Sequence, residues 1–245
     1  MSVKTPQQAF AEECQAEIHD QGNNAALCEL AQTFYNESAK HKYTYHFSWM
    51  GRPIIQLPQD MVAMQELIWK LKPDLIIECG IAHGGSIIYY ASVMELVDHG
   101  EVLGIDRDIR PHNREAIESH PMFKRISMIE GSSIDPAVVE QVRALAEGKK
   151  VIVVLDSNHT HEHVLAELRA YAPLVSQDSY CVVMDTVVED MPADAFPDRP
   201  WGIGDNPRTA VRAYLEETED FVIDADIHDK LLITVARDGY LRRVR

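Results

Sequence analysis

Residues 75–86, "LIIECGIAHGGS", decide the fold class. Apolar residues run into an acid and then into a glycine-rich turn, which is the pattern of a buried strand that ends beside a ligand. Gly80, Gly84 and Gly85 allow the backbone to turn tightly and to come close to that ligand. A helix expected from about Ser86 would direct its backbone amides at the same place.

Strands and helices alternate on both sides of this segment. Short apolar runs occur at 75–79, 102–106, 126–130, 151–156 and 180–185, mostly separated by segments with helical spacing. This alternation predicts parallel strands covered by helices on both faces.

The end of the chain breaks this rhythm. Residues 221–226 and 231–236 are separated only by "IHDK", which is too short for a parallel crossover, so we expect an antiparallel hairpin. The predicted fold is α/β: a Rossmann-like, doubly wound, mostly parallel seven-stranded sheet with a C-terminal antiparallel hairpin. This is the arrangement of class I methyltransferases, although a fold alone does not prove a function.

The N-terminal part has a different pattern. Residues 6–38 have helical spacing, and an aromatic, irregular stretch follows at 43–60. Apolar residues recur at helical spacing from Met61 to Leu71, and Pro73 ends that helix. We therefore expect a helical and aromatic addition at 1–60 and a class I methyltransferase domain at 61–245.

Composition narrows the classes of partner. The 245 residues are 46% hydrophobic and have a net charge of −16, which disfavours nucleic acid and anionic membranes as partners. No leader is visible and no apolar run approaches the ~20 residues of a membrane helix, so a cytoplasmic protein is expected. The cysteines lack a CxxC spacing and are interpreted as reduced thiols: Cys14, Cys28, Cys79 and Cys181.

The glycine turn does not fit a dinucleotide. The GxGxxG fingerprint, read from Gly80, fails at Ala82. Glu78 at the end of the strand would repel a pyrophosphate but attract a cationic ammonium or sulfonium group. These features favour S-adenosylmethionine as the ligand. An ordinary strand-to-helix turn with a solvated Glu78 is the alternative.

The next two strands add donor-site candidates. Asp106 ends its strand where a doubly wound fold places a carboxylate that binds ribose hydroxyls, or it is a simple turn acid. Ser132 and Ser133 would line an adenine edge or cap the next helix. The predicted donor-binding residues are Glu78, Gly80, His83, Gly84, Gly85, Ser86, Asp106, Ser132 and Ser133.

Two carboxylates predict a metal site. Asp156 and Asp185 end two strands, so both should lie at the same edge of the sheet, beside the glycine turn. Adjacent strands are ~4.8 Å apart, which allows the carboxylates to converge on one ion. Oxygen ligands suit Mg²⁺ rather than zinc. Acids that cap nearby loops are the alternative.

The sequence "HTHEH" offers three histidines and, with Asp156, raises the possibility of a non-haem iron site. If Thr160 caps a helix, however, His161 and His163 fall on different faces and cannot reach one ion with His159. His159 is then the candidate general base. Asp156 is an alternative base, and His83 and His112 belong to donor-side loops.

Several ordered motifs carry a family resemblance. The stretches "WMGRPIIQLPQD", "ECGIAHGGS", "GIDRDI", "GSSID", "LDSNHTHEHVLAELRAYAPLV" and "YCVVMDTVVEDMP" resemble the cephalosporin hydroxylase family over roughly residues 40 to 240. That family has the class I S-adenosylmethionine-dependent methyltransferase fold, and the chain is more distantly similar to magnesium-dependent macrolide sugar O-methyltransferases. The resemblance implies methyl transfer to a small hydroxylated natural product or sugar, often with a divalent metal.

One residue departs from the family pattern. A Glu–Asp pair is common in the family where this sequence has Met184 before Asp185. A full set of three protein ligands is therefore in doubt. Thr186 or Asn158 would complete the shell, or metal binding is weak or absent.

Two segments are expected to shape the acceptor pocket. Residues 186–207 form a long Pro- and Gly-rich loop of the kind that serves as a lid. The aromatic residues around Tyr45 would cover the pocket or pack between subunits of a homo-oligomer. The predicted activity is O-methylation of a small acceptor; the alternatives are an iron-dependent hydroxylase and a non-catalytic, donor-binding partner subunit.

Overall fold

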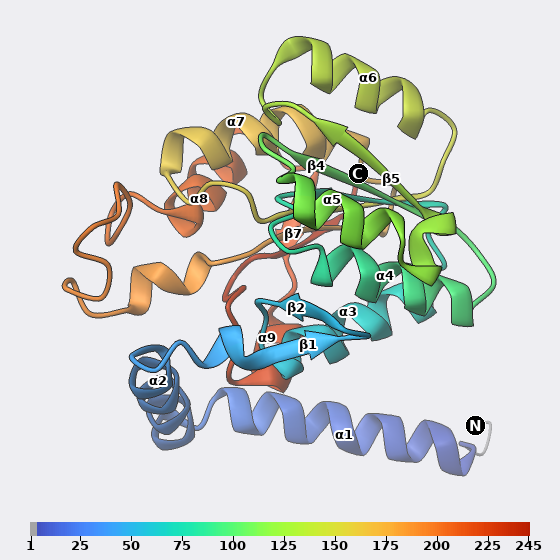
Figure 1. Ribbon diagram of the computed structural model, residues 1–245. Helices are drawn as coiled ribbons and strands as arrows, with labels where there is room; N and C mark the ends of the chain where they lie inside the picture. The colour runs from blue at the N-terminus through green and yellow to red at the C-terminus, as the bar shows by residue number, and fades with distance from the viewer. Residues whose placement is uncertain (1–3) are drawn as a thin grey trace.

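The computed structural model describes residues 4–245, so the first three residues of the expected N-terminal addition lie outside the described part (Figure 1). The helices are α1 (Pro6–Gly22), α2 (Ala25–Ala39), α3 (Pro58–Leu71), α4 (Gly85–Leu96), α5 (Pro111–Glu118), α6 (Pro136–Ala146), α7 (His161–Tyr171), α8 (Pro207–Glu217) and α9 (Ala225–Leu231). The strands are β1 (Phe47–Trp49), β2 (Arg52–Ile54), β3 (Leu75–Cys79), β4 (Glu101–Asp106), β5 (Ile126–Glu130), β6 (Val151–Leu155), β7 (Tyr180–Val183), β8 (Phe221–Ile223) and β9 (Tyr240–Arg243). Short 3₁₀ helices are η1 (Tyr43–His46), η2 (Pro121–Arg125), η3 (Ala172–Leu174) and η4 (Thr186–Asp190).

A twisted sheet forms the centre of the molecule (Figure 1). Within residues 4–245 it has seven strands in the order β5-β4-β3-β6-β7-β9-β8. The first five of these are parallel, and β9 is antiparallel to both of its neighbours. The predicted mostly parallel sheet is confirmed.

Strands β4, β3 and β6 end at the same level. Cys79, the last residue of β3, lies opposite Ile105 in β4 and Leu155 in β6. The pairing continues into the turns, because Gly80 N–H donates to the Ile105 carbonyl (2.7 Å) and Asp156 N–H donates to the Cys79 carbonyl (2.8 Å). The turns after all three strands therefore meet at one edge of the sheet.

Helices cover both faces of the sheet, as expected for a doubly wound fold. Apolar residues of α3, α4 and α5 pack on one face with Ile76 of β3, and those of α6, α7 and α8 pack on the other with Ile77. Alternate residues of each buried strand thus contribute to two separate cores, which accounts for the continuous apolar runs in the sequence. The four cysteines are free thiols, and two of them, Cys79 and Cys181, are buried.

The C-terminal antiparallel pair exists, but its second strand was predicted in the wrong place. Strand β8 pairs with Tyr240–Arg243 (β9) and not with residues 231–236. The residues after β8 instead form α9, in which Ile227 and Leu231 pack against the core. The backbone of the segment 232–236 is used elsewhere, because Val235 N–H donates to the side chain of Asp60.

The N-terminal part is helical, as predicted, but the helical region is divided into two helices. Asn23 is the C-cap of the first, and Asn24 caps the second, where its side chain accepts from Leu27 N–H. The side chain of Gln21 at the end of α1 donates to the Asp229 carbonyl of α9 (2.7 Å). The aromatic stretch forms the β1–β2 hairpin, and Trp49 Nε1 donates to Ser92 Oγ of α4 (2.9 Å). Within residues 4–245, no helix is both long and apolar enough to span a membrane.

A buried carboxylate connects α3 to the C-terminal segment. Asp60 is fully buried and accepts hydrogen bonds from Thr234 Oγ1, from Val235 N–H (3.0 Å) and from the Tyr240 hydroxyl (3.0 Å). Burial raises the pKa of Asp60 to about 6, because these donors do not fully replace the lost hydration of the charged form.

This pKa shift predicts a pH-dependent contribution to folding stability. The folded state binds the proton of Asp60 more tightly than the unfolded state does, so stability should fall as pH rises from about 4 to about 6. A shift of about two pH units corresponds to roughly 3 kcal/mol. Urea unfolding of the wild type and of Asp60→Asn, from pH 4.5 to 7.5, measures the contribution of Asp60 ionisation to the free energy of unfolding. The difference in unfolding free energy between the two proteins should change with pH; parallel curves would contradict the prediction.

Candidate active site

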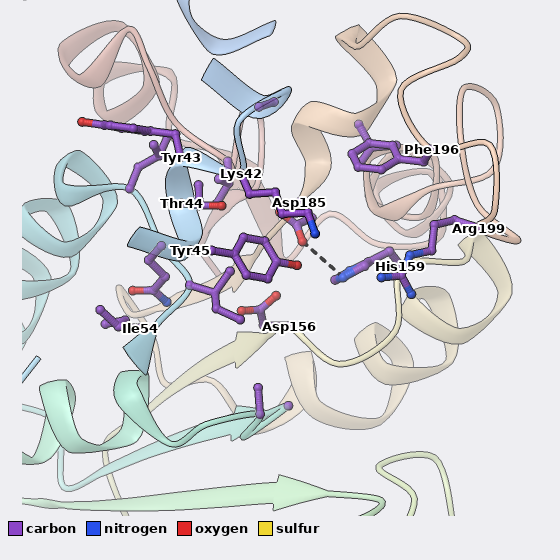
Figure 2. A pocket seen from close by; sticks show the side chains of 18 of the residues that line it. Lys42, Tyr43, Thr44, Tyr45, Ile54, Asp156, His159, Asp185, Phe196 and Arg199 are labelled. Carbon is purple, nitrogen blue, oxygen red and sulfur yellow. Dashed lines mark ion pairs between the residues drawn. The ribbon is translucent and has the colours of Figure 1, made fainter. Parts of the chain in front are cut away.

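A cavity of about 770 Å³ opens at the carboxyl ends of β3, β6 and β7. The glycine turn, residues 80–86, forms one wall, and the segment around η1 forms a second. The loop after η4 forms a third wall, so the predicted position of this loop over the cavity is observed. Figure 2 shows side chains from these segments converging on the space above Asp156.

Two glycines of the turn are required by close backbone contacts. Gly80 has φ +103°, and a Cβ atom there would lie 2.0 Å from the Asp156 carbonyl oxygen. A Cβ atom on Gly85 would lie 2.1 Å from the Pro53 carbonyl oxygen of β2. Both glycines line the cavity, so the turn is packed against protein backbone on one side and faces the cavity on the other. His83 and Ser86 also line it.

Glu78 lies beneath the turn and does not line the cavity. It is fully buried, and its Oε2 accepts from Ser86 Oγ (2.6 Å), while Oε1 has no partner among the described residues. Burial, with a contribution from the nearby charge of Asp106, raises the pKa of Glu78 to about 8. Near neutral pH the group therefore holds a proton, and a cation placed beside it would favour the charged form.

Asp106 stabilises the same turn. One carboxylate oxygen accepts from Ile81 N–H (2.8 Å) and Ala82 N–H (3.2 Å), and the other accepts from Asp108 N–H (3.1 Å). Ala82 has φ +46°, a left-handed conformation that these bonds support. Asp106 is not among the cavity-lining residues, so its predicted contact with ribose hydroxyls stays a prediction.

The serines after β5 do not line the cavity, and Asp135 caps α6 in their place. Ser133 Oγ instead donates to Glu167 Oε1 (2.5 Å), which also accepts from Ser157 Oγ (2.6 Å). Glu167 is a fully buried carboxylate of α7 that we did not predict as a site residue. It connects the loop after β5 to the loop after β6, where Asp156 lies. The predicted contact of Ser132 and Ser133 with adenine stays a prediction.

Asp156 and Asp185 come together as the strand order requires, since β6 and β7 are adjacent and parallel. His159 joins them: ligand-type atoms of these three residues lie within 4.8 Å of one another. His159 Nε2 is 3.2 Å from Asp185 Oδ2 (Figure 2). Asp185 has φ +55°, and this left-handed residue follows Met184, which is buried in the core.

The two residues expected to complete the shell in place of an acidic residue at Met184 differ in position. Thr186 is buried and its hydroxyl donates to the Val235 carbonyl (3.4 Å). Asn158 lines the cavity, and its Oδ1 accepts from Thr160 N–H (2.9 Å). The predicted role of either residue as a metal ligand stays a prediction, and His159 is the histidine that lies with the two acids.

The charge of the cluster suits a divalent cation. Burial and the neighbouring carboxylates, Asp185 first among them, raise the pKa of Asp156 well above its usual range. A cation between the two carboxylates would remove this repulsion. Carboxylate oxygens at the mouth of an open cavity, with space for water and substrate, are ligands that Mg²⁺ or Mn²⁺ accepts.

The three histidines of "HTHEH" diverge, as predicted. His161 Nδ1 is 2.8 Å from Thr209 Oγ1 of α8, and His163 Nε2 is 3.3 Å from Glu167 Oε1. Thr160 precedes the first residue of α7, but its side chain makes no capping hydrogen bond. His112 is exposed on α5 and does not line the cavity.

Several residues of the aromatic segment before β1 line the cavity, among them Tyr43, Thr44 and Tyr45. Figure 2 shows the Tyr45 ring above Asp156 and beside the Asp185–His159 pair. Trp49 instead packs edge-to-face on Tyr89 of α4, with ring centroids 5.0 Å apart. Across the cavity, Trp201 of the loop after η4 lies 5.1 Å from the His159 ring, centroid to centroid. The sequence indicated the loop but not this contact, which depends on how the loop folds back.

Comparison with known proteins gives consistent matches. Residues 41–244 match the family model described as Rhamnosyl O-methyltransferase/CmcI. The rhamnosyl O-methyltransferase of Mycobacterium bovis is 32% identical over 235 residues, which cover 93% of this chain and 89% of that protein.

Solved structures of CmcI share the fold of this chain. The apo form has a TM-score of 0.58 at 20% identity and covers 82% of this chain and 77% of that one. The form with Mg and S-adenosylmethionine has a TM-score of 0.56 at 19% identity, covering 82% and 78%. With a family model that spans nearly the whole chain and a relative of this identity and coverage, the chain belongs to the rhamnosyl O-methyltransferase/CmcI family.

Proposed function

We propose that this chain transfers the methyl group of S-adenosylmethionine to a hydroxyl group of a small, sugar-containing acceptor. The observation that carries the proposal is that the glycine turn and the Asp156–His159–Asp185 cluster line one cavity. The names of the relatives, which are rhamnosyl O-methyltransferases, support a deoxysugar hydroxyl as the acceptor.

The reaction is an in-line displacement. An acceptor oxygen attacks the methyl carbon, the carbon–sulfur bond breaks, its electron pair stays on sulfur, and the hydroxyl proton leaves to a base. Orientation of donor and acceptor supplies much of the rate in such reactions. The chain therefore has to hold the donor on the glycine-turn side and the acceptor oxygen at the acid–histidine cluster.

The donor-side residues are those of the glycine turn and its supports. Gly80, His83, Gly85 and Ser86, which line the cavity, would contact the donor directly, and Gly84, with φ +82°, would support the turn. Glu78, which accepts a hydrogen bond from Ser86, would stabilise the positive charge of the donor. Asp106 holds the turn by accepting from Ile81 N–H, and its carboxylate would also accept from the ribose hydroxyls. The cavity lining supports the residues of the glycine turn as donor contacts. Ser132 and Ser133 follow β5 and do not line the cavity, so their contact with the adenine has less support.

Asp156 and Asp185 would hold a divalent cation, for which we propose Mg²⁺, as in the CmcI structure that contains it. Such an ion supplies a fixed position for the acceptor oxygen and lowers the pKa of its hydroxyl. His159, beside Asp185, is then placed to take the acceptor proton. Asp156 is the alternative base.

The alternative functions have less support. An iron-dependent hydroxylase would need a further histidine at the site, but His161 contacts Thr209 of α8 and His163 contacts Glu167 within α7. Met184, in place of an acidic residue, suggested a non-catalytic subunit. The described residues nevertheless contain a cluster of two acids and a histidine in the cavity, and this cluster does not need a carboxylate at position 184.

We also propose that the protein acts as a cytoplasmic homo-oligomer, with residues 1–60 as an addition to the methyltransferase domain. Exposed apolar side chains on the two N-terminal helices support a subunit contact: Phe10 is 68% exposed and Leu30 is 67% exposed. Neither nucleic acid nor a membrane is proposed as a partner.

The donor assignment predicts that S-adenosylhomocysteine, the demethylated product, binds and that NAD does not. Asp106→Ala should weaken binding by on the order of 1.5–3 kcal/mol, because it removes charged hydrogen bonds from the turn and from the ribose. Calorimetry measures this change. Asp108→Ala removes an exposed acid two residues away and is the matched control. Unchanged affinity in Asp106→Ala would exclude this residue from the donor site.

The metal assignment predicts that a chelator abolishes turnover and that Mg²⁺ or Mn²⁺ restores it. Asp185→Asn removes one charged ligand and should lower the affinity for Mn²⁺, measured by electron paramagnetic resonance, at least tenfold. Asp178→Asn, at an acid whose side chain is 70% exposed, should behave as the wild type. Full activity after exhaustive chelation would show that the two acids only orient the acceptor.

The base assignment predicts that His159→Gln loses at least ~100-fold in turnover, since a positioned base contributes on that scale. The acidic limb of the pH–rate profile should disappear with it. Donor and Mn²⁺ affinities are measured in parallel, which separates a base from a metal ligand. His112→Gln, at an exposed histidine outside the cavity, is the control. A near-normal rate with the same acidic limb would exclude His159 as the base.

A further inference from the structure

The side of the cavity away from the glycine turn is aromatic. Tyr45 lines it from the segment before β1, and Phe196 and Trp201 line it from the loop after η4. Figure 2 shows Tyr45 on one side of the Asp185–His159 pair and Phe196 on the other. The donor assignment uses none of these rings.

Trp201 is held by three neighbours. Its ring lies 4.5 Å from that of Phe196, centroid to centroid, and the Arg199 guanidinium lies over it at 5.9 Å. The His159 ring packs against it nearly at right angles, with an interplanar angle of 84°. The indole is only partly buried, and it lines the cavity.

The backbone beside Trp201 is also fixed, although the loop is long. Asn206 is fully buried, and its Nδ2 donates to the Gly202 carbonyl (2.8 Å) and to Glu189 Oε2. Gly204 N–H donates to the same carboxylate oxygen (2.9 Å). Glu189 thus connects η4 to the far end of the loop. The indole beside His159 is placed by a buried hydrogen-bond network.

We propose that Trp201 is the binding platform for the acceptor sugar ring and that Glu189, through Asn206 and Gly204, positions it. The proposal rests on the proposed function, because it assigns the acceptor half of the same cavity. The ligand class is a pyranose with one largely unsubstituted C–H face, such as a 6-deoxyhexose.

The juxtaposition of base and indole carries the argument. A sugar hydroxyl that reaches His159 brings its adjoining ring carbons against Trp201, since the two side chains are in contact. The same hydroxyl then lies beside Asp156 and Asp185, because His159 Nε2 is 3.2 Å from Asp185 Oδ2 and ligand-type atoms of the three residues lie within 4.8 Å of one another. Aromatic walls with a few placed polar groups are the usual construction of small-molecule sites. Here the aromatic wall selects the face of the sugar, and the polar cluster selects the hydroxyl.

The experiment uses methyl α-L-rhamnopyranoside as the acceptor probe, with S-adenosylmethionine and Mg²⁺. Trp201→Ala should raise the acceptor KM about tenfold, which equals about 1.4 kcal/mol. The affinity of this variant for S-adenosylhomocysteine should stay within about twofold of the wild-type value, because loss of a donor contact would weaken binding by more than that. Trp201→Phe keeps an aromatic ring, so its acceptor KM should be close to that of the wild type. Trp69→Ala, at an indole that is 59% exposed on α3, is the matched control.

Saturation-transfer NMR gives a readout that does not require turnover. With S-adenosylhomocysteine bound, protons on one face of the probe should receive the strongest saturation in the wild type, and this preference should be lost in Trp201→Ala. Glu189→Ala should raise the acceptor KM as Trp201→Ala does. Glu189→Gln keeps a side-chain oxygen that accepts from Gly204 and Asn206, so its acceptor KM should be close to that of the wild type. The double variant Trp201→Ala/Glu189→Ala should be no worse than Trp201→Ala alone, because both changes remove one contact.

Distinct results overturn the two proposals. An unchanged acceptor KM in Trp201→Ala overturns the platform, and so does a matching loss of donor affinity. If Trp201→Ala does not fold, Trp201→Leu, which also removes the aromatic ring, takes its place in this comparison. Additive effects of Trp201→Ala and Glu189→Ala overturn the positioning role of Glu189. If the wild type methylates no sugar but the face-selective saturation is present, the proposed function fails and the subsite stands. If both are absent, both fail.

Discussion

The level at which β4, β3 and β6 end is the constraint on which the site depends. The three strands pair in register up to Cys79, and the first residues of two turns continue the pairing, so Gly80 and Asp156 are in backbone contact. Only glycine fits at position 80, because a side chain would overlap the Asp156 carbonyl. The donor-side turn and the first acid of the cluster are therefore placed by the same few backbone hydrogen bonds.

Acidic groups gather at this edge at an electrostatic cost. Burial and the charges of Asp185 and Glu78 raise the pKa of Asp156, and burial and the charge of Asp106 raise the pKa of Glu78. A protein with a net charge of −16 offers little compensation from distant cations. The cationic sulfonium of the donor and a divalent ion would each relieve one part of this repulsion. The acids that repel one another would thus stabilise the complex with the donor and the ion.

The sequence predicted what local patterns determine. Apolar runs located the parallel strands, and strand-end positions brought Asp156 and Asp185 together because adjacent parallel strands share an edge. Contacts across the chain were missed. The segment 231–236 has the composition of a strand, but Asp60 binds its backbone, and the strand lies further on. Glu167 looked like one polar residue in a helix, and the position of Trp201 depends on Asn206.

The two halves of the cavity differ in how far their walls can move when a ligand leaves. The donor half is built from backbone in contact with backbone, at Gly80 against Asp156 and Gly85 against Pro53, so it cannot widen without disrupting the sheet edge. The proposed acceptor half is lined by a loop whose return depends on one oxygen of the Glu189 carboxylate, Oε2. Conformational entropy can therefore be gained in this half at the loss of a few hydrogen bonds. A ligand on this side would thus be exchanged by movement of the loop, while the glycine turn keeps its shape.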